Sequence, residues 1–473
     1  MAYINGRWIE TASQLEVINP ATNEIIGKVP VVGKTETIEA IESAKEAFKS
    51  WKKTTFPERV YYLEKVVTLL REQHEEIAQL ITKENGKPIG DSRDEVESGI
   101  AYIEWYAEEA KRIYGDVLPA SSQNKHLIVK RQPIGVCAAI TPWNFPFSMI
   151  TRKIAPALAT GCTVVLKPAS ATPLSAVKVF ECFDKAGLPE GVINLVIGSA
   201  QEIGNEMTKS EDVRKISFTG STAVGKLLFR DSADTVKAIS MELGGHAPFI
   251  VFDDSDVNIA VEGILNTKFG NSGQTCVSTN RIYVQSGIAE KFTKALTKKV
   301  SKLKVGNGLD EDVDVGPIID QKSFDKIMEQ IEDVRDKKGK IICGGEQYAN
   351  NTGGKFIQPT IITEANEKML IATEETFGPV VPIFTFETEE EIIEKANHKH
   401  YGLAGYCYTS DLGRAFRVSE ELEYGMIGVN DSSPFVIQAP FGGIKESGLG
   451  QEGGKYGLEG YLITKYISFN ANY

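Results

Sequence analysis

The stretches Gly135–Pro146, GVCAAITPWNFP, and Thr163–Ala169, TVVLKPA, carry the pattern that decides the fold class. Each stretch is a short apolar run that ends in a turn containing proline. Further short apolar runs, separated by stretches with helical spacing, follow at Ile193–Ile197, Ile216–Phe218 and Phe249–Phe252. Such alternation is typical of βαβ units, which build an open parallel sheet through right-handed crossovers. These sheets bind ligands beyond the carboxyl ends of their strands, so the sequence predicts a nucleotide-binding type of α/β fold.

Helices are expected before this region. Apolar residues recur at helical spacing over Thr35–Trp51, Leu63–Ile81 and Glu95–Tyr114. The tripeptide Gly86-Lys87-Pro88 is interpreted as the end of the second helix. The aromatic residues of the third helix are interpreted as core packing.

A second alternating region follows the first. Its apolar runs are Ile282–Val284, Lys340–Ile342, Val380–Phe386 and Gly405–Tyr408. They predict a second α/β unit. Two more expected strands, Lys125–Arg131 and Tyr461–Phe469, stand outside both units and can pair across a subunit interface.

Length, charge and cysteine content restrict the class of protein. With 473 residues, the chain exceeds the roughly 250–300 residues at which a single core stops growing, so at least two domains are expected. The net charge of −12 argues against nucleic acid as a partner, because phosphate binding needs a basic surface. No stretch approaches the ~18 consecutive apolar residues of a membrane span, and Met1–Glu10 lacks the features of a secretory signal. The six cysteines include no CxxC pair, so no metal site is expected, and reduced thiols favour a cytoplasmic location.

Cys276 ends the stretch Phe269–Cys276, FGNSGQTC, in which small residues lead into a single thiol. Such an open setting keeps a thiol reachable, as a nucleophile requires. A lone cysteine is more often a small buried hydrophobe, so other motifs have to support catalysis. A cysteine protease is not favoured, because only His246 of the five histidines lies in a motif-like setting.

Glu242 lies in Met241–Gly245, MELGG, after an apolar strand and before two glycines. A carboxyl group buried there would have a raised pKa, which suits a general base that takes a proton from water. The alternative is a glutamate in a salt bridge at the end of a strand.

Asn144 lies in Ile140–Pro146, ITPWNFP, where two prolines enclose an aromatic residue and an amide. A side-chain amide in a rigid loop can stabilise a developing oxyanion together with a backbone N–H. An ordinary turn asparagine is the alternative.

Three other turns suit a nucleotide. Lys167 ends a strand in Val164–Ala169, VVLKPA, and Phe218–Gly225, FTGSTAVG, leads into a helix. A helix N-terminus favours pyrophosphate, and a lysine can bond ribose hydroxyls or attract a 2′-phosphate. The glycines do not form GxGxxG, so this turn alone is a weak signal. Glu375–Pro379, ETFGP, adds a carboxylate and an aromatic ring that can grip a ribose and bracket a flat ring.

In this order and spacing, the motifs resemble those of the aldehyde dehydrogenase superfamily from about Ile18 to Ile467. The resemblance implies an α/β fold with a Rossmann-like cofactor domain, a second α/β catalytic domain and a small β oligomerisation segment. It places the cofactor domain at 1–116 and 135–242 and the catalytic domain at 243–446. Segments 117–134 and 447–473 would serve oligomerisation or bridging, in a homodimer or homotetramer.

The resemblance also implies roles for individual residues. Cys276 matches the nucleophile, Glu242 the general base, and Asn144 the oxyanion donor that acts with the Cys276 backbone N–H. Lys153 and Glu452 match a proton-relay pair. The expected cofactor-binding residues are Ile140, Thr141, Trp143, Lys167, Ser170, Gly220, Ser221, Gly225, Leu243, Glu375 and Phe377.

The reaction implied is the NAD(P)-dependent oxidation of an aldehyde to a carboxylic acid, through a cysteine thiohemiacetal and a thioester. Relatives that pass the acyl group to coenzyme A generally lack the glutamate matched by Glu242. An acylating enzyme is therefore a distant alternative, as is a non-catalytic structural relative.

Within the superfamily, Met149–Lys153, MITRK, and the C-terminal motifs look most like succinate-semialdehyde dehydrogenases. The expected substrate is therefore succinic semialdehyde, with Arg152 holding its distal carboxylate. Those enzymes usually carry an arginine where Gly270 stands and a serine near Phe435. These departures make a neutral aliphatic or aromatic aldehyde the alternative substrate.

Ser170 bears on the choice of cofactor. Many relatives that prefer NAD have a glutamate at this position, and a glutamate would repel a 2′-phosphate. Serine removes this repulsion, and Lys167 supplies a nearby positive charge. We therefore expect NADP as the cofactor, with NAD also accepted, and Lys178 is a candidate for a further cation near the phosphate.

Overall fold

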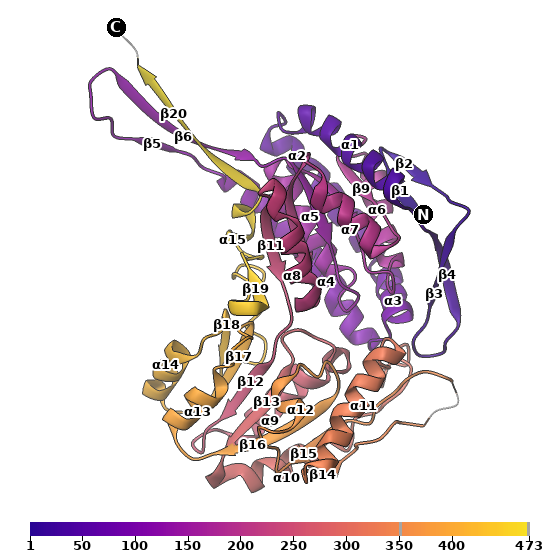
Figure 1. Ribbon diagram of the computed structural model, residues 1–473, viewed down its shortest axis with the longest axis vertical. Helices are drawn as coiled ribbons and strands as arrows, with labels where there is room; N and C mark the ends of the chain where they lie inside the picture. Colours follow the sequence, from indigo (N-terminus) through magenta and orange to yellow (C-terminus); the bar gives the residue numbers. More distant parts are fainter. Residues whose placement is uncertain (350–351, 471–473) are drawn as a thin grey trace.

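The computed structural model describes residues 1–349 and 352–470, and two large sheets organise the chain (Figure 1). Eight strands form the first sheet, in the order β19 (Gly448–Leu449), β11 (Ala238–Glu242), β10 (Val213–Thr219), β7 (Val136–Ile140), β8 (Thr163–Lys167), β9 (Ile193–Leu195), β1 (Ala2–Ile4) and β2 (Arg7–Ile9). The five strands from β11 to β9 are parallel, whereas β19 and β1 add antiparallel to them.

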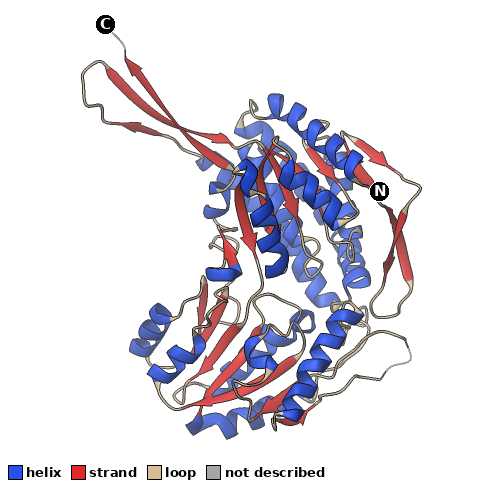
Figure 2. Cartoon of the chain, viewed as in Figure 1, coloured by secondary structure: helices blue, strands red, loops and turns tan. Residues whose placement is uncertain are grey.

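Helices surround this first sheet (Figure 2). They are α1 (Lys34–Trp51), α2 (Phe56–Glu72), α3 (His74–Asn85), α4 (Ile89–Glu109), α5 (Ser148–Thr160), α6 (Leu174–Ala186), α7 (Ala200–Lys209) and α8 (Thr222–Asp231). Every side chain of α5 is buried, because this helix packs between α4 and the sheet.

The second sheet has seven strands, in the order β14 (Lys340–Cys343), β15 (Thr360–Thr363), β16 (Val380–Phe386), β13 (Thr279–Gln285), β12 (Ala247–Val251), β17 (Ala404–Tyr408) and β18 (Met426–Val429). All of its neighbouring pairs are parallel except β14 with β15. Its helices are α9 (Val257–Phe269), α10 (Ala289–Val300), α11 (Gln321–Asp336), α12 (Leu370–Thr373), α13 (Glu389–Ala396) and α14 (Leu412–Glu421). The two expected α/β units are therefore both present.

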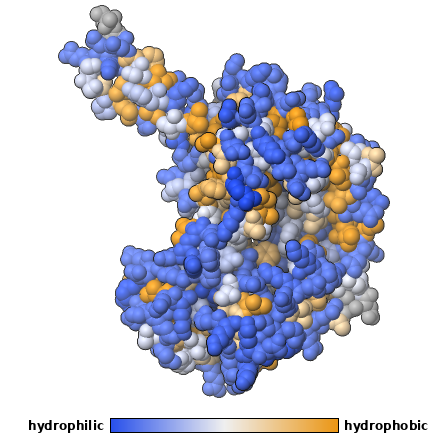
Figure 3. All heavy atoms as spheres, viewed as in Figure 1, coloured by the Kyte–Doolittle hydropathy of each residue, from blue (hydrophilic) through white to orange (hydrophobic). Residues whose placement is uncertain are grey.

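A three-stranded sheet protrudes from the molecule (Figure 1). It consists of β5 (Asp116–Leu118), β6 (Lys125–Pro133) and β20 (Leu462–Asn470), and nine residue pairs join β20 to β6. Its surface carries apolar side chains, among them Val117 and Tyr466, which are 82% and 57% exposed (Figure 3). The remaining elements are a hairpin of β3 (Gln14–Ile18) and β4 (Ile25–Pro30) and the short helix α15 (Tyr456–Glu459).

Two expected helices differ from the observed ones. The helix expected over Leu63–Ile81 is two helices, α2 and α3, because the backbone leaves helical geometry at Gln73. The helix expected over Glu95–Tyr114 begins earlier, at Ile89, directly after Pro88, whose ring fixes φ and suits a helix start. No helix within the described residues is long and apolar enough to cross a membrane.

Candidate active site

The loop that presents Cys276 lies between α9 and β13 and turns sharply. Asn271, Ser272 and Gly273 all have positive φ, at 47°, 56° and 75°. The second glycine of MELGG runs directly past this loop, because a Cβ on Gly245 would lie 2.3 Å from the carbonyl oxygen of Cys276. A glycine is therefore required at position 245, because the backbone there approaches the backbone of Cys276 closely.

Cys276 lies at the junction of two cavities. One, of about 950 Å³, is lined by residues that include Trp143, Asn144, Gly220, Ser221, Leu243, Glu375 and Phe377. The other, of about 490 Å³, is lined by residues that include Arg152, Gly270 and Phe435. The first cavity contains seven residues predicted for the cofactor or the oxyanion, and the second contains the three predicted for the substrate. A thiol between them can meet a ligand from either side.

Several charges act on the Cys276 thiol. Burial raises its pKa to about 12, and the carboxylates of Glu375 and Glu242 add to this effect. The Arg152 guanidinium opposes it by favouring the thiolate. The nucleophile is therefore protonated at rest near neutral pH.

Glu242 ends β11 and is almost fully buried. Neither of its carboxyl oxygens has a hydrogen-bond partner among the described residues. Burial raises its pKa well above the ordinary value, and repulsion from Glu452 adds to the rise, while Lys153 and Arg152 oppose it. The structure thus disfavours the alternative of a glutamate in a salt bridge, and it supplies the desolvated carboxyl group that a base requires. Glu242 lines neither of the two cavities, so its carboxyl group lies behind their walls.

Lys153 and Glu452 form a buried ion pair next to this carboxyl group. Lys153 Nζ also donates to Ser217 Oγ at 3.2 Å, and Ser217 Oγ donates to Glu452 Oε1 at 3.4 Å. These side chains come from α5, β10 and the segment after β19, so three distant parts of the chain meet here. Ser217 was not expected from the sequence, where it is an ordinary small residue in a strand.

Asn144 is held against the loop that carries Cys276. Its Nδ2 donates to the carbonyl oxygen of Gln274 at 3.0 Å. Because an amide nitrogen has two hydrogens, one can still be donated into the cavity that Asn144 and Cys276 share.

The larger cavity carries features that suit a nicotinamide nucleotide. The rings of Trp143 and Phe377 meet edge to face at 5.7 Å, and Glu375 Oε1 accepts a bond from Gly245 N at 3.0 Å. Ser221 caps the N-terminus of α8, where the free N–H groups favour an anion. A volume of about 950 Å³ and a buried Thr219 Oγ1 that has no partner among the described residues fit a polar ligand of this size.

Other expected cofactor residues lie around this cavity without lining it. Ile140 ends β7 and Thr141 follows it, and Thr141 Oγ1 is also buried with no partner in the described part of the chain. Gly225 packs against Leu243, since a Cβ on Gly225 would lie 2.3 Å from Leu243 Cδ2. Because Gly225 has no side chain, α8 can pack closely on the MELGG motif at Leu243.

Lys167 and Ser170, two further residues expected to bind the cofactor, do not line the larger cavity. Lys167 Nζ donates to the Pro168 carbonyl oxygen at 3.1 Å, and burial lowers its pKa to about 8. Ser170 is exposed. Lys178, the candidate for a further cation, already pairs with Glu76 at 2.7 Å, so its charge is neutralised.

Arg152 lies in the smaller cavity between two aromatic rings. Its guanidinium carbon is 4.8 Å from the ring centre of Tyr102 and 4.4 Å from that of Phe441. The side chain is buried, with Nη1 3.8 Å from Glu452 Oε2, yet Nε and Nη1 have no hydrogen-bond partner among the described residues. The structure thus places a cation that is incompletely hydrogen-bonded within the described residues in the cavity that also contains Cys276. Tyr102, which had been interpreted as core packing only, also lines this cavity.

Gly270 and Phe435 shape the rest of the smaller cavity. A Cβ on Gly270 would meet no atom within 4 Å, so this side of the cavity is open. The Phe435 ring packs at 5.7 Å from Phe441 and 6.3 Å from Tyr406.

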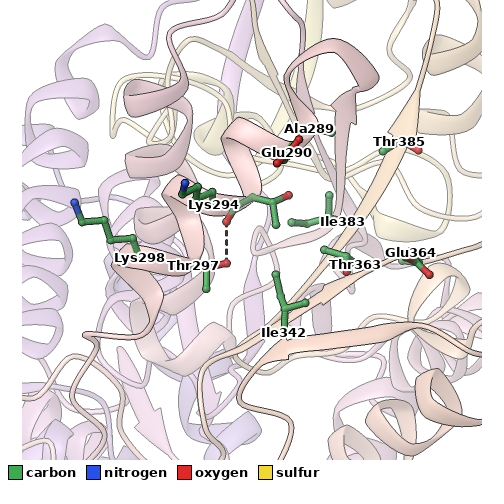
Figure 4. A pocket seen from close by; sticks show the side chains of 12 residues that line it. Ala289, Glu290, Lys294, Thr297, Lys298, Ile342, Thr363, Glu364, Ile383 and Thr385 are labelled. Carbon is green, nitrogen blue, oxygen red and sulfur yellow. Dashed lines mark hydrogen bonds between the residues drawn. The ribbon is translucent and has the colours of Figure 1, made fainter.

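A further groove of about 680 Å³ lies between α10 and the strands β14 to β16 (Figure 4). Its lining residues include Lys294, Thr297 and Ile342, and it shares no residue with the cavities around Cys276. None of the catalytic, cofactor-binding or substrate-binding residues expected from the sequence lines this groove.

Comparisons with known proteins agree with the geometry. The profile of the aldehyde dehydrogenase family matches residues 8–467. A 3-sulfolactaldehyde dehydrogenase from Pseudomonas putida is 50% identical over 98% of this chain and 96% of its own length. An NADP(+) succinate-semialdehyde dehydrogenase from Escherichia coli is 50% identical over 98% of this chain and 97% of its own length.

A crystal structure of an aldehyde dehydrogenase from Brucella melitensis biovar abortus has a TM-score of 0.98 and 50% sequence identity, covering 100% of this chain and 97% of that one. The fold class and the enzyme class expected from the motifs are confirmed. The chain belongs to the aldehyde dehydrogenase family.

Proposed function

We propose that the protein oxidises an aldehyde to a carboxylic acid by covalent catalysis at Cys276. The observation that carries this proposal is the position of the thiol at the junction of two cavities, beside an amide donor and within the electrostatic reach of Glu242. The carboxyl oxygens of Glu242 are buried and have no hydrogen-bond partner among the described residues. One cavity would hold the cofactor and the other the aldehyde.

In the first half of the reaction, the Cys276 thiolate adds to the aldehyde carbon. The free N–H of the Asn144 amide and the backbone N–H of Cys276 would stabilise the oxyanion of this adduct. A bound nicotinamide supplies the hydride acceptor, and loss of hydride leaves a thioester on Cys276.

In the second half, Glu242 takes a proton from the water that hydrolyses the thioester, and the acid leaves. Burial is the main cause of the raised pKa of Glu242, and the raised pKa makes its carboxylate a stronger base toward this proton. Lys153 and Glu452 lie beside it and would carry the proton away.

We propose NADP as the preferred cofactor, with NAD also accepted. Trp143, Gly220, Ser221, Leu243, Glu375 and Phe377 would hold the nicotinamide half, and Lys167 and Ser170 the adenosine half. A relative that is 50% identical is named for NADP(+), which supports the proposal.

We propose a short aldehyde with an acidic group at its far end, succinic semialdehyde first, as the substrate. The support is the Arg152 guanidinium in the cavity that also contains Cys276, because a guanidinium pairs well with a carboxylate. Two of its nitrogens, Nε and Nη1, have no hydrogen-bond partner among the described residues. The names of two relatives, for succinate semialdehyde and 3-sulfolactaldehyde, point to acid-bearing aldehydes as well.

A neutral or aromatic aldehyde is the second candidate. The open space at Gly270 and the ring of Phe435 favour it, because they supply volume and apolar surface and no second charge.

Arg152→Ala and Gly270→Arg decide between the two substrates. If Arg152 holds a carboxylate, Arg152→Ala should raise KM for succinic semialdehyde at least tenfold and spare a neutral aldehyde of equal length. Gly270→Arg should then improve the acidic substrate. The measurement is kcat/KM for both aldehydes with each cofactor. Equal effects of Arg152→Ala on both aldehydes would reject the acidic substrate in favour of the second candidate.

We also propose that residues 1–116 and 135–242 serve cofactor binding, that 243–446 carry the nucleophile, and that 117–134 and 447–473 join subunits into a homodimer or homotetramer. Residues 350–351 and 471–473 lie outside the described residues. Exposed apolar side chains on β5 and β20 support the subunit contact.

All six cysteines are free thiols, which supports a cytoplasmic location.

A further inference from the structure

Lys87 and Glu95 form an ion pair that is completely buried. Lys87 lies in the turn between α3 and α4, Glu95 lies in the second turn of α4, and Nζ and Oε2 are 2.6 Å apart with both side chains at 0% exposure. Two charges are costly to remove from water, and a pair of apolar residues often serves stability equally well. The other contacts of this pair therefore show what it does.

All side-chain hydrogen bonds of the pair beyond the pair itself end on one loop. Lys87 Nζ donates to the carbonyl oxygen of Asn144 at 2.7 Å and lies 3.9 Å above the ring of Phe145. Glu95 Oε1 accepts from the backbone N–H groups of Phe147 and Ser148, at 2.8 and 3.1 Å. This loop joins β7 to α5 and carries the proposed oxyanion donor.

The same loop is fixed from the opposite side by residues next to Cys276. Asn271 Nδ2 donates to the carbonyl oxygen of Asn144 at 3.0 Å, and Asn144 Nδ2 donates to the carbonyl oxygen of Gln274 at 3.0 Å. The carbonyl oxygen of Asn144 thus accepts from both sides, and both bonds are buried. Asn85, in the turn that contains Lys87, also donates to the carbonyl oxygen of Trp143 at 3.0 Å.

We infer that Lys87 and Glu95 are positioning residues for the oxyanion step, setting the distance between the Asn144 amide and Cys276. The inference rests on the proposed function of these two residues. An oxyanion donor has to lie about 2.7–3.1 Å from the developing charge, and a displacement of about 1 Å can cost on the order of 100-fold in rate. The proposed action of the pair is through Asn144. Lys87 lines neither cavity, whereas Glu95 also lines the smaller one, so Lys87 is the residue that tests the inference first.

Glu84, in the last turn of α3 and three residues before Lys87, provides a matched control. It is also fully buried, but its carboxylate accepts from the backbone N–H groups of Leu174 and Ser175, at 2.8 and 2.9 Å, at the start of α6. Glu84→Gln therefore disturbs the fold near Lys87 without changing a bond to the loop of Asn144.

A double-mutant cycle tests the inference in the full-length protein. The measured quantity is the rate of the first hydride transfer, from the burst of reduced cofactor at saturating aldehyde and NADP. We expect Lys87→Met to slow the burst by roughly 10- to 100-fold in the wild-type background and by less than about 3-fold in the Asn144→Ala background. Glu84→Gln should have the same small effect in both backgrounds. An equal loss from Lys87→Met in both backgrounds would overturn the inference, because the lysine would then act independently of Asn144.

Two reactions of the thiol supply a second readout. A p-nitrophenyl ester acylates Cys276 through an oxyanion, whereas iodoacetamide alkylates it without one. Lys87→Met should slow the first reaction and leave the second within about twofold. A parallel fall in both would show general disorder of the loop and would also overturn the inference.

Glu95→Gln goes through the same cycle if Lys87→Met does not fold, since glutamine keeps one acceptor for the backbone and removes the charge. Its expected results and the result that would overturn the inference are the same as for Lys87→Met.

Failure of the proposed function gives a different result: the wild-type protein would show no burst, or Asn144→Ala would leave the burst unchanged. If Asn144→Ala slows the burst and the variants of the pair do not, only the positioning role is rejected.

Discussion

At the scale of single residues, the Cys276 thiol is controlled by charges of opposite sign. Burial, together with Glu375 and Glu242, raises its pKa, and Arg152 lowers it. The same arginine is the proposed partner of the substrate. Substrate binding and thiolate formation are therefore linked through one side chain, because a bound carboxylate would partly neutralise the charge that favours the thiolate.

The rate at which iodoacetamide alkylates Cys276 should report the pKa that results from these opposing effects. With the pKa raised to about 12, the thiolate fraction grows about tenfold per pH unit, and the rate should still rise at pH 9 to 10. Arg152→Ala removes a positive charge, so the pKa rises further and alkylation slows at every pH below it. Peptide mapping of the labelled thiol checks the site, with Cys276→Ala as the control. A rate that levels off below pH 8 would contradict this prediction.

Cys276→Ala should also abolish aldehyde oxidation and leave cofactor binding intact, since no other nucleophile lies at the junction of the two cavities among the described residues. Steady-state turnover and titration of cofactor fluorescence measure the two properties. Residual turnover above a few per cent would exclude Cys276 as the nucleophile.

Glu242→Gln should separate the two halves of the reaction. The hydride burst should persist, whereas steady-state turnover should fall by about 100- to 10,000-fold because the thioester no longer meets an activated water. Burial raises the pKa of Glu242, so the ionised base forms as pH rises, and wild-type turnover limited by hydrolysis should increase in the same direction. In Glu242→Gln, steady-state turnover should no longer increase with pH in this way. Normal steady-state turnover by Glu242→Gln would remove this residue from the mechanism.

The sequence allowed prediction of residues whose role is visible in a local pattern. Cys276, Asn144 and Glu242 each lie in a short motif at or after the end of a strand or helix. Asn144 and Cys276 line one cavity, and Glu242 lies outside its lining but acts on the pKa of Cys276. Lys87 and Glu95 could not be found in this way, because their contacts with Asn144 and Phe147 span 57 and 52 residues. Pro88 beside Lys87 suggested a helix boundary, which is correct, but it gave no sign of the buried pair.

At the scale of elements, apolar runs located many but not all strands of the two sheets, and their bounds were uneven. Val380–Phe386 coincides with β16, whereas Ile193–Ile197 is longer than β9. The run Ile216–Phe218 is part of β10, which extends from Val213 to Thr219. Strand ends carry polar residues that point toward a ligand or a neighbouring helix, and hydropathy cannot distinguish these residues from a loop. Lys215 shows the same difficulty inside a strand: it is fully buried in β10 and donates to Ser240 Oγ in the neighbouring β11.

The turn between β8 and α6 should determine the choice of cofactor. Ser170 is exposed and lies three residues after Lys167. Within the described part of the chain Lys167 has no acidic partner that could compete with a phosphate, whereas Lys178 pairs with Glu76. Ser170→Glu should therefore lower kcat/KM for NADP selectively, by about 10- to 100-fold, because a carboxylate repels the 2′-phosphate. Ser170→Gln, of equal size and no charge, is the control. A wild-type protein that strongly prefers NAD would refute the argument from Ser170.

At the scale of the whole molecule, the protruding sheet is the part that has least to pack against within one chain. Val117, Ile128 and Ile467 lie in register on neighbouring strands and so share one face of this sheet. Val117 is 82% exposed. A strip of apolar residues on three paired strands is typical of a surface that a partner covers.

Charges on this face should weaken subunit association. Val117→Asp combined with Ile467→Asp would place carboxylates in the proposed interface, so the protein should shift to monomers at micromolar concentration. Light scattering coupled to size exclusion gives the mass, and Ser121→Asp, in the turn between β5 and β6, is the control. An unchanged mass for the double variant would exclude this face as the contact.

The Lys153–Glu452 pair also has a consequence for protein synthesis. The two residues are separated by 299 positions, and a ribosome adds about 5–20 residues per second, so roughly 15 to 60 s pass between them. During this interval β11 and the Cys276 loop have been made, but β19, which pairs with β11, and Glu452 have not. A nascent chain thus holds the nucleophile before it holds the relay beside Glu242. Under the proposed mechanism, thioester hydrolysis starts only once residue 452 has left the ribosome, so translation itself sets the earliest moment of turnover.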